Sequence, residues 1–440
     1  MKKTALSIIF LLLLAPQVID YQPTFAADNT WSYSYNGPYN ETGALALVQA
    51  GDDGYVVLAS TKELFSVYSE RSIWLLRINS YGVIEWNKTI PLPISDFLWS
   101  ITSTIDGGFA LAGEKDFSST INNVYSLNGK GIDFWLVKTN KYGNIEWNKT
   151  YGGSWHEGAR TLVSTSDGGY ALAGYTWSFE PNGYWLVKTD GNGTLQWSKS
   201  YDSNYGASEL IQTFDGGFSL VGTNGPKVKV VKTDENGLAE WSISLGELSQ
   251  ETQDQARSIV ETDDGGFVIL GYAYTGFYNV VYSWLCKVNS TGSQEWFQTF
   301  DGNYVCFAKV YSGGFVLAGS SNSSNCLVRT DALGNIEWVK PLGNLNSSYV
   351  KSVLETVNGF VVAGSSNSPT NGSRIIWIMR TDEYGNAPQS FSSPPIIPKQ
   401  PEKESFPVLP LTASVAAVAI VSIGLLAYFK KRKHMKNTKQ

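Results

Sequence analysis

The sequence predicts an all-β fold, a seven-bladed β-propeller whose blades are four-stranded antiparallel sheets. Three observations lead to this prediction. A unit that closes on a tryptophan recurs about every 40 to 60 residues, a period typical of propeller blades. Each unit contains four short apolar stretches separated by turn residues, as expected of antiparallel strands. The first and last units are incomplete in complementary ways.

The repeat is clearest over residues 159–197. Apolar strands at 159–163 and 170–174 flank an Asp-Gly-Gly turn, and residues 184–190 lead through a second turn to a tryptophan strand. Asp-Gly between apolar runs is a strong hairpin signal, because the turn needs residues that tolerate positive φ. We name the four strands a to d in chain order. The tryptophans of strand d in the complete units are Trp86, Trp147, Trp197, Trp241, Trp296 and Trp338.

The two ends predict how the ring closes. The last unit has strands a to c near 350–354, 360–364 and 375–381, but the chain then runs into Pro388 where strand d belongs. Residues 31–37, before the first complete unit, match the spacing of Trp, Tyr and Gly in a d strand. We therefore expect the N-terminal strand to complete the last blade. Eight blades is the alternative count.

Both termini carry export and membrane signals. Residues 1–26 combine a basic start, a short apolar run and a small-residue cleavage position, which is typical of a signal peptide; an N-terminal membrane helix is the alternative. Residues 408–429 are long and apolar enough to span a bilayer. The basic tail at 430–440 predicts a cytoplasmic end. We expect a single-pass type I protein of the cell membrane with its propeller, residues 27–388, outside the cell.

A stalk is predicted between the propeller and the membrane. Residues 389–407 are rich in Pro and Ser, and such a stretch forms a semi-rigid spacer without a core. Residues 409–413, Leu-Pro-Leu-Thr-Ala, also resemble a sortase sorting signal, so covalent attachment to a cell wall is the alternative to a retained helix. Sequons consistent with an extracellular glycoprotein occur at Asn40, Asn87, Asn148, Asn192, Asn289, Asn322, Asn346 and Asn371.

Charge and cysteine content argue against a nucleic-acid-binding protein and against a disulfide-rich protein. Without the leader and the basic tail, about 25 basic residues face about 38 acidic ones, a net charge near −13. Nucleic acids and anionic lipid surfaces are held by basic patches, so neither is the expected partner of the propeller. The three cysteines, Cys286, Cys306 and Cys326, are an odd number placed in strands. We expect free, buried thiols rather than a disulfide framework.

The c–d signature Thr-Asp-x-x-Gly-x-x-x-Trp, as in residues 233–241, resembles the tryptophan repeats of quinoprotein-like β-propellers of a surface-anchored prokaryotic type. The resemblance covers residues 31 to about 385. It implies the blade type and leaves the function open, because such blades serve both cofactor enzymes and scaffolds. Quinone-dependent dehydrogenases of this family place two adjacent cysteines over the cofactor. No two cysteines are adjacent here, so we expect no cofactor.

Metal and catalytic chemistry have few candidate residues. His156 and the tail residue His434 are the only histidines. The loop 190–194 has calcium-like ligands, but similar residues recur as turns in most units, so no metal is expected. The sequence has no Asp box of the sialidase type. Carboxylates in the d–a loops that could serve glycoside cleavage are Glu41, Asp96, Glu157 and Glu247.

A ligand is expected on the face formed by the d–a and b–c loops, which vary in length from unit to unit. We call it the variable-loop face. Variable loops on a rigid scaffold are the usual place for binding residues, and aromatic rings suit sugars or protein hot spots. Aromatic residues in these loops are Tyr39, Phe65, Tyr125, Trp155, Trp177, Tyr205, Phe277 and Tyr278. The candidate ligand-binding residues are Trp155, His156, Trp177, Tyr125, Tyr205, Arg160 and Arg257.

Arg160 and Arg257 occupy equivalent positions in strand a, where the other blades have Leu45, Trp99, Ser208, Val305 and Lys351. Such side chains would face the central channel. The sequence favours a recognition or scaffold module for an extracellular protein or glycan. The alternative is an extracellular carbohydrate-active hydrolase or lyase that uses carboxylates of the variable-loop face.

Overall fold

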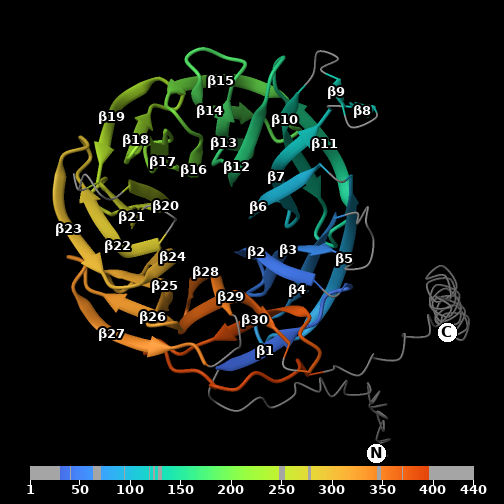
Figure 1. Ribbon diagram of the computed structural model, residues 1–440, viewed down its shortest axis with the longest axis vertical. Helices are drawn as coiled ribbons and strands as arrows, with labels where there is room; N and C mark the ends of the chain where they lie inside the picture. Colours follow the sequence, from blue (N-terminus) through green and yellow to red (C-terminus); the bar gives the residue numbers. More distant parts are fainter. Residues whose placement is uncertain are drawn as a thin grey trace, which may run out of the picture. The chain divides into compact units, whose positions relative to one another are not determined.

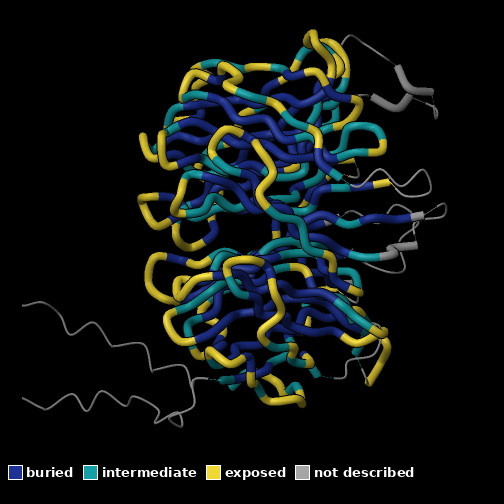
Figure 2. The backbone as a smooth tube through the Cα atoms, turned by 90° about the vertical axis from the view of Figure 1, so that its left-hand side faces the viewer, coloured by how far each residue is buried: buried dark blue, intermediate teal, exposed yellow. Residues whose placement is uncertain are grey.

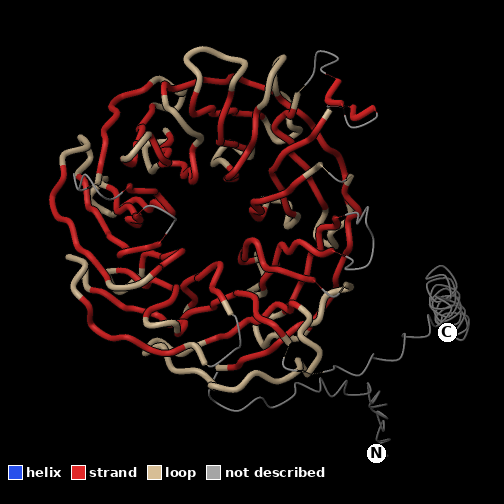
Figure 3. The backbone as a smooth tube through the Cα atoms, in the orientation of Figure 1, coloured by secondary structure: helices blue, strands red, loops and turns tan. Residues whose placement is uncertain are grey.

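The computed structural model of the chain describes residues 30–39, 41–62, 71–93, 95–117, 119–121, 124–126, 131–246, 253–275, 279–343, 348–368 and 370–395. These residues form β-strands joined by turns and loops, and none of them is helical (Figure 3). The strands radiate around a central axis in seven blades, with strand a of each blade innermost and strand d on the rim (Figure 1).

Each blade is a four-stranded antiparallel sheet. Blade 1 is β2 (Glu41–Gln49), β3 (Tyr55–Lys62), β4 (Arg71–Ile78) and β5 (Ile84–Leu92); blade 2 is β6 (Phe97–Ser103), β7 (Phe109–Asp116), β10 (Ile132–Thr139) and β11 (Ile145–Tyr151), with the hairpin β8 (Ser119–Ile121) and β9 (Val124–Ser126) between β7 and β10. Blade 3 is β12 (Glu157–Ser164), β13 (Tyr170–Thr176), β14 (Gly183–Thr189) and β15 (Leu195–Asp202); blade 4 is β16 (Ala207–Gln212), β17 (Phe218–Asn224), β18 (Lys227–Thr233) and β19 (Ala239–Leu245).

The remaining three blades complete the ring. Blade 5 is β20 (Gln253–Glu261), β21 (Phe267–Thr275), β22 (Asn279–Val288) and β23 (Gln294–Phe300); blade 6 is β24 (Asn303–Lys309), β25 (Phe315–Ser321), β26 (Ser324–Thr330) and β27 (Ile336–Pro341). Blade 7 is β28 (Tyr349–Thr356), β29 (Gly359–Asn367), β30 (Arg374–Arg380) and, from the other end of the chain, β1 (Trp31–Tyr35). The seven-blade count is thereby confirmed.

Ring closure follows the predicted route. β1 pairs antiparallel with β30, so that Trp31 lies opposite Arg380, and Figure 1 shows the two strands side by side. Trp31 and Arg380 both donate a hydrogen bond to the carbonyl of Ser80 in blade 1, each at 3.1 Å. The N-terminal strand therefore joins the last blade to the first.

The core lies between neighbouring blades rather than at one centre. Strands b and c carry runs of buried apolar residues, because each of their faces packs on an adjacent blade. The burial pattern places these buried strands inside the ring and exposed turns along its left-hand edge (Figure 2). The strand-d tryptophan of each of blades 1 to 6 packs on the strand-b aromatic of the next blade, as Trp147 does on Tyr170, with ring centroids 6.0 Å apart. The tryptophan repeat is thus an inter-blade contact.

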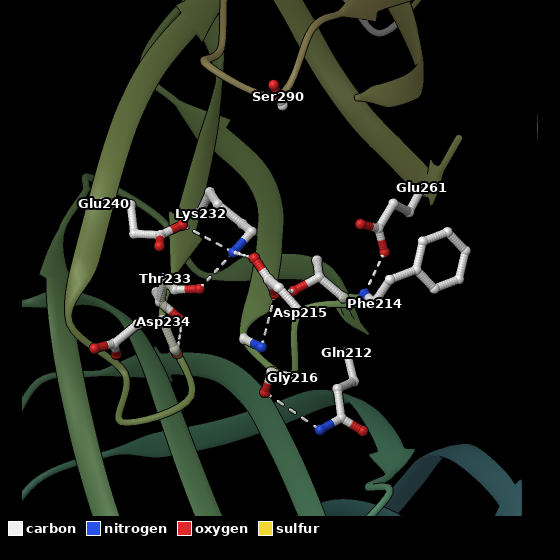
Figure 4. A network of polar contacts seen from close by, with 12 residues as sticks. Gln212, Phe214, Asp215, Gly216, Lys232, Thr233, Asp234, Glu240, Glu261 and Ser290 are labelled. Atoms are coloured by element: carbon white, nitrogen blue, oxygen red, sulfur yellow. Dashed lines mark hydrogen bonds and ion pairs between the residues drawn. The ribbon is translucent and has the colours of Figure 1, made fainter. Parts of the chain in front are cut away.

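A buried lysine explains the Asp-Gly-Gly turn. In blade 4 the Lys232 amine donates to the carboxylates of Asp215 at 2.7 Å and Glu240 at 2.9 Å, and to the carbonyl of Thr233 at 2.8 Å (Figure 4). These groups come from strand c, the a–b turn and strand d, so one cation ties the a–b turn to strands c and d. Lys138 and Lys287 have the same pattern. Lys188 also donates to its turn aspartate, but its strand-d partner is the amide oxygen of Gln196.

The first residues of the predicted stalk contact the propeller. Phe391 packs on Trp377 with ring centroids 5.6 Å apart, and Ser392 exchanges backbone hydrogen bonds with Ser32 and Ser34 of β1. No helix within the described ranges is long and apolar enough to cross a membrane. The predicted leader 1–26, membrane segment 408–429 and tail 430–440 lie outside those ranges.

The three cysteines are free, and Cys286 and Cys326 are buried. Burial raises the pKa of the Cys286 thiol to about 12. The expectation of unpaired thiols in strands is confirmed, but Cys306 is only half-buried and lines the central cavity.

Candidate functional site

The centre of the ring is a wide channel whose shape depends on a bulge in every innermost strand. A cavity of about 1700 Å³ is lined by residues of all seven blades. Strand a of each blade skips one residue in its pairing with strand b, and a bulge re-aims the side chain of the extra residue. The seven skipped residues are Leu45, Trp99, Arg160, Ser208, Arg257, Val305 and Lys351. All seven line the cavity.

In six of the seven blades a strand-b glycine lies opposite the residue before the bulge, whereas blade 1 has Ala59 there. A Cβ at Gly174 would lie 1.8 Å from the carbonyl oxygen of Gly158, just before the bulge at Arg160. The corresponding distance at Gly113 is 1.9 Å, to the carbonyl oxygen of Phe97. Because a side chain cannot occupy that space, glycine allows the backbone approach that turns the bulge residue toward the channel.

Three of the predicted site residues belong to one connected cluster in blades 2 and 3. The Arg160 guanidinium lies over the rings of Trp99 and Tyr175, at 5.3 and 5.9 Å from their centroids. Tyr175 contacts Trp177 at 5.8 Å, and Trp177 contacts the His156 ring at 5.6 Å. This series of contacts runs from the channel to the variable-loop face. We call these five residues the aromatic–arginine cluster.

Electrostatic pairing fixes Arg160 within the cluster. Its Nη2 lies 3.3 Å from Oε1 of Glu114. Burial raises the pKa of Glu114, and the positive charge of Arg160 opposes that rise. Burial, together with the Glu114 charge, raises the pKa of Tyr175 to about 12. Arg160 thus has a carboxylate partner inside the protein.

The other predicted residues are dispersed. Trp155 is 57% exposed and its backbone N–H donates to Ser178 Oγ at 2.8 Å, which ties the d–a loop to the b–c loop of blade 3. Tyr205, in the d–a loop before blade 4, is 58% exposed and lines the cavity. Arg257 lies in blade 5, apart from the cluster. Tyr125 lies in β9 and its side chain is outside the described part of the structure, as are Phe65, Phe277 and Tyr278.

Two of the carboxylates considered for glycoside cleavage hold loops in place. Glu157 is fully buried and accepts hydrogen bonds from Gly153 N at 2.8 Å, Thr176 Oγ1 at 3.1 Å and Ser178 N at 3.0 Å. Asp96 is 1% exposed, pairs with the Lys115 amine and accepts from Asp116 N at 3.0 Å. The side chains of Glu41 and Glu247 lie outside the described set.

The loop with calcium-like residues is a turn. The Asp190 carboxylate accepts the backbone N–H groups of Asn192 at 2.9 Å and Thr194 at 2.7 Å. These hydrogen bonds lower the pKa of Asp190. Within the described ranges no three His, Cys, Asp or Glu side chains are grouped closely enough to hold a metal ion.

A second set of channel residues was not selected from the sequence. Tyr272, Tyr349 and Arg374 line the cavity beside Arg257 and Lys351. Lys351 occupies the same position as the two arginines, and it lines the channel because a bulge lies there. Tyr349 and Arg374 are the first residues of β28 and β30, and Tyr272 follows Gly271 within β21. An alignment of these strand positions across the seven units could have found them.

Comparison with known proteins supports the fold alone. No protein-family model matches the chain, and no curated protein sequence matches it either. Among solved structures, the polysaccharide lyase Uly1 is similar with a TM-score of 0.50 at 11% identity, covering 83% of this chain and 94% of the lyase. Chaetomium thermophilum Sqt1, bound to the N-terminus of ribosomal protein L10, gives 0.49 at 11% identity over 81% of this chain and 100% of Sqt1. The periplasmic gluconolactonase of Pseudomonas aeruginosa has a TM-score of 0.47 at 13% identity, covering 67% of this chain and 83% of the gluconolactonase.

Proposed function

We propose that the chain is an extracellular recognition or scaffold module, held at the cell membrane by residues 408–429, that binds a protein or glycan on its variable-loop face. The observation that carries this proposal is the set of exposed rings on that face. Trp155, Trp177 and Tyr205 are 57%, 58% and 58% exposed. Large rings left in solvent on a rigid scaffold are the residue type that supplies most of the energy at protein and sugar interfaces.

The scaffold under these rings is rigid. Glu157 holds the blade 3 loops that carry Trp155 and Trp177 through buried hydrogen bonds. Preorganised loops lose little conformational entropy on binding, which favours recognition. An enzymatic role needs titratable groups that converge on the cavity. Asp96 and Glu157 are committed to loop structure instead, which favours recognition over the carbohydrate-active alternative.

The test measures binding of the purified full chain to a glycan array and to cell-surface extracts. A double variant, Trp155→Ala with Trp177→Ala, should lose at least tenfold in affinity, because truncation of interface aromatics commonly costs more than 1.4 kcal/mol. The matched control is Tyr142→Ala with Tyr384→Ala. These two rings are 55% and 60% exposed on the c–d turns at the opposite ends of the strands. Equal binding by both double variants and the unmodified chain would exclude the variable-loop face.

Membrane attachment is tested separately. A chain ending at residue 395 should leave the membrane fraction, while the full chain should stay in it until detergent is added. Recovery of the full chain in a soluble fraction would reject the anchor without affecting the binding proposal.

A further inference from the structure

Among the described residues, three cations face the channel and form no ion pair with a carboxylate. Arg257 and Lys351 are bulge residues of blades 5 and 7, and Arg374 is the first residue of β30. All three line the cavity. Every ion pair between described residues belongs to another cation, including the fourth channel cation, Arg160. The charges of Arg257, Lys351 and Arg374 are therefore uncompensated within the described structure.

Neutral groups hold two of these cations in position. The Arg257 guanidinium lies over the Tyr272 ring at 4.1 Å, and its Nη2 donates to Asn303 Oδ1 at a long 3.4 Å. Its Nε is buried and has no hydrogen-bond partner among the described residues. Arg374 lies over the Tyr349 ring at 5.2 Å. Ring contacts orient a guanidinium without using its N–H groups, so those groups are available to a ligand.

The electrostatics of this region favour an added negative charge. Burial lowers the pKa of Lys351, and the nearby charge of Arg257 lowers it further. Burial also lowers the pKa of Arg257. The two acidic residues that line the cavity are Asp96, paired with Lys115, and Glu209, which accepts from Thr161 Oγ1 at 2.7 Å. Although the whole chain has a net charge of −6, the described side chains in this part of the channel carry a net positive charge.

The rest of the lining suits a ligand rich in hydroxyl groups. The side-chain amides of Asn182, Asn204 and Gln255 line the same cavity, as do several serines. Trp177 and Tyr205 offer exposed rings to the cavity from the variable-loop face. Amides bind hydroxyls, and aromatic faces stack on sugar rings. An acidic peptide would use the cations but would leave this combination of rings and amides without a role.

We propose that the channel binds a carboxylate of an acidic oligosaccharide, with Arg257, Lys351 and Arg374 as the anion site. The inference rests on the proposed recognition function and specifies its ligand class. Arginine forms paired hydrogen bonds to a carboxylate, and lysine adds a point charge. The sugar ring extends from the anion site toward Trp177 and Tyr205.

Calorimetry on the detergent-solubilised full chain tests the proposal with three probes: oligogalacturonate, its methyl ester and an oligoglutamate peptide of equal charge. Glucuronate and mannuronate oligomers are tested alongside oligogalacturonate. We expect a uronate oligomer to bind, and its affinity to fall as salt rises because the site is electrostatic. The ester, which keeps the ring and loses the charge, should bind at least tenfold more weakly.

Variants locate the site. Lys351→Gln and Arg257→Gln should each reduce affinity for the uronate about tenfold or more, since each removes a charge-assisted hydrogen bond. Lys141→Gln is the matched control, because it removes the same charge from an exposed c–d turn and should bind as the unmodified chain does. Circular dichroism confirms that each variant is folded.

Four results would overturn the proposal: ester and free acid binding equally, binding unchanged in both channel variants, tighter binding of oligoglutamate than of any uronate, or no uronate bound. The last result, combined with binding on the array that is lost in the Trp155→Ala/Trp177→Ala variant, would reject the anion site and leave the recognition function standing.

Discussion

Trp147 lies against Gly193 of the next blade, so closely that a Cβ on this glycine would come within 2.7 Å of the indole. The same contact recurs around the ring, between Trp86 and Gly143 and, across the closure, between Trp31 and Gly82. Gly193 has a φ of +73°. The c–d glycine is therefore required both by its turn and by the neighbouring blade.

Alanine at Gly193 should be more destabilising than alanine at a turn glycine in open space. Gly168 has a similar φ of +82° but nothing within 4 Å of its added Cβ. We expect Gly168→Ala to cost about 1–2 kcal/mol from backbone strain. Gly193→Ala should cost about 1–3 kcal/mol more from overpacking. Urea unfolding measures the difference, and equal values would show that the indole moves aside freely.

Loss of the closing tryptophan should destabilise the whole ring. Trp31 is 6% exposed, and its indole N–H bonds to Ser80 across the closure. We expect Trp31→Ala to lower the free energy of unfolding by about 3–5 kcal/mol. Trp155→Ala, which truncates a ring 57% exposed, should change it by no more than about 0.5 kcal/mol. Similar values for the two variants would contradict the conclusion that β1 closes the ring by joining blade 7 to blade 1.

The lysine networks predict acid sensitivity at low pH. Burial would raise the pKa of Asp106, but hydrogen bonds from Lys138 and Thr104 outweigh it and lower the pKa to about 2. Asp167 has a pKa of about 2 for the same reasons, with Lys188 as donor. Because unfolded aspartate titrates near pH ~3.9, these groups stabilise the fold above about pH 4. That stabilisation is lost as pH falls toward 2.

Urea unfolding between pH 2 and pH 5 measures this loss. In Lys138→Met the pKa of Asp106 should return toward its ordinary value, and the slope of stability against pH should become smaller. An unchanged slope would show that the ion pair does not set the pKa.

Thiol reactivity should report unfolding. Burial raises the pKa of Cys286 and Cys306 to about 12, so at pH 8 roughly one thiol in ten thousand is ionised. We expect slow labelling of both by an aromatic disulfide reagent in the native protein and rapid labelling of all three cysteines in urea. Cys286→Ser should lower the number of thiols labelled in urea by one and leave the labelling of the native protein unchanged. Fast labelling of the native chain would place a thiol in a more open environment.

Glu157 should act on the loops rather than on a reaction. Its carboxylate accepts backbone N–H groups of Gly153 and Ser178, and Glu157→Gln would turn an amide donor toward one of them. We expect a cost of about 1–3 kcal/mol and weaker ligand binding, because Trp155 and Trp177 lose their support. Amide hydrogen exchange at residues 152–156 measures the loosening. Unchanged exchange would mean that the loops are held by other contacts.

The architecture could be predicted because it depends on local chemistry that repeats. Trp31 and the missing strand after residue 381 were enough to predict the closure. Each incomplete end could be compared with six complete repeat units, which shows what it lacks. The sequence predicts that Arg160 and Arg257 face the channel, but it does not predict the bulge that turns them there. Arg160 and Arg257 align with Lys351 in the sequence, but only the bulge and the glycines of strand b turn these residues inward.

Roles that depend on tertiary partners were also missed. Glu157 and Asp96 look like loop carboxylates in the sequence, whereas their burial depends on backbone N–H groups of a different loop. In the sequence Lys232 is one polar residue of a strand, and its partners come from the a–b turn and from strand d. The pairing of Arg160 with Trp99 joins two blades. Sequence patterns within one unit carry no information on such contacts.

Because β1 pairs with the last blade, it is synthesised long before the strand that it pairs with. Ser32 and Pro388, which are hydrogen-bonded, are 356 residues apart in the chain. At the usual ~5–20 residues per second, the ribosome needs roughly 20–70 s to deliver the partner of β1 after β1 itself has emerged. During this interval six blades can form in sequence, while the oldest strand waits with an open edge that could pair with another chain. Slow or interrupted elongation in the last blade would prolong that exposure most.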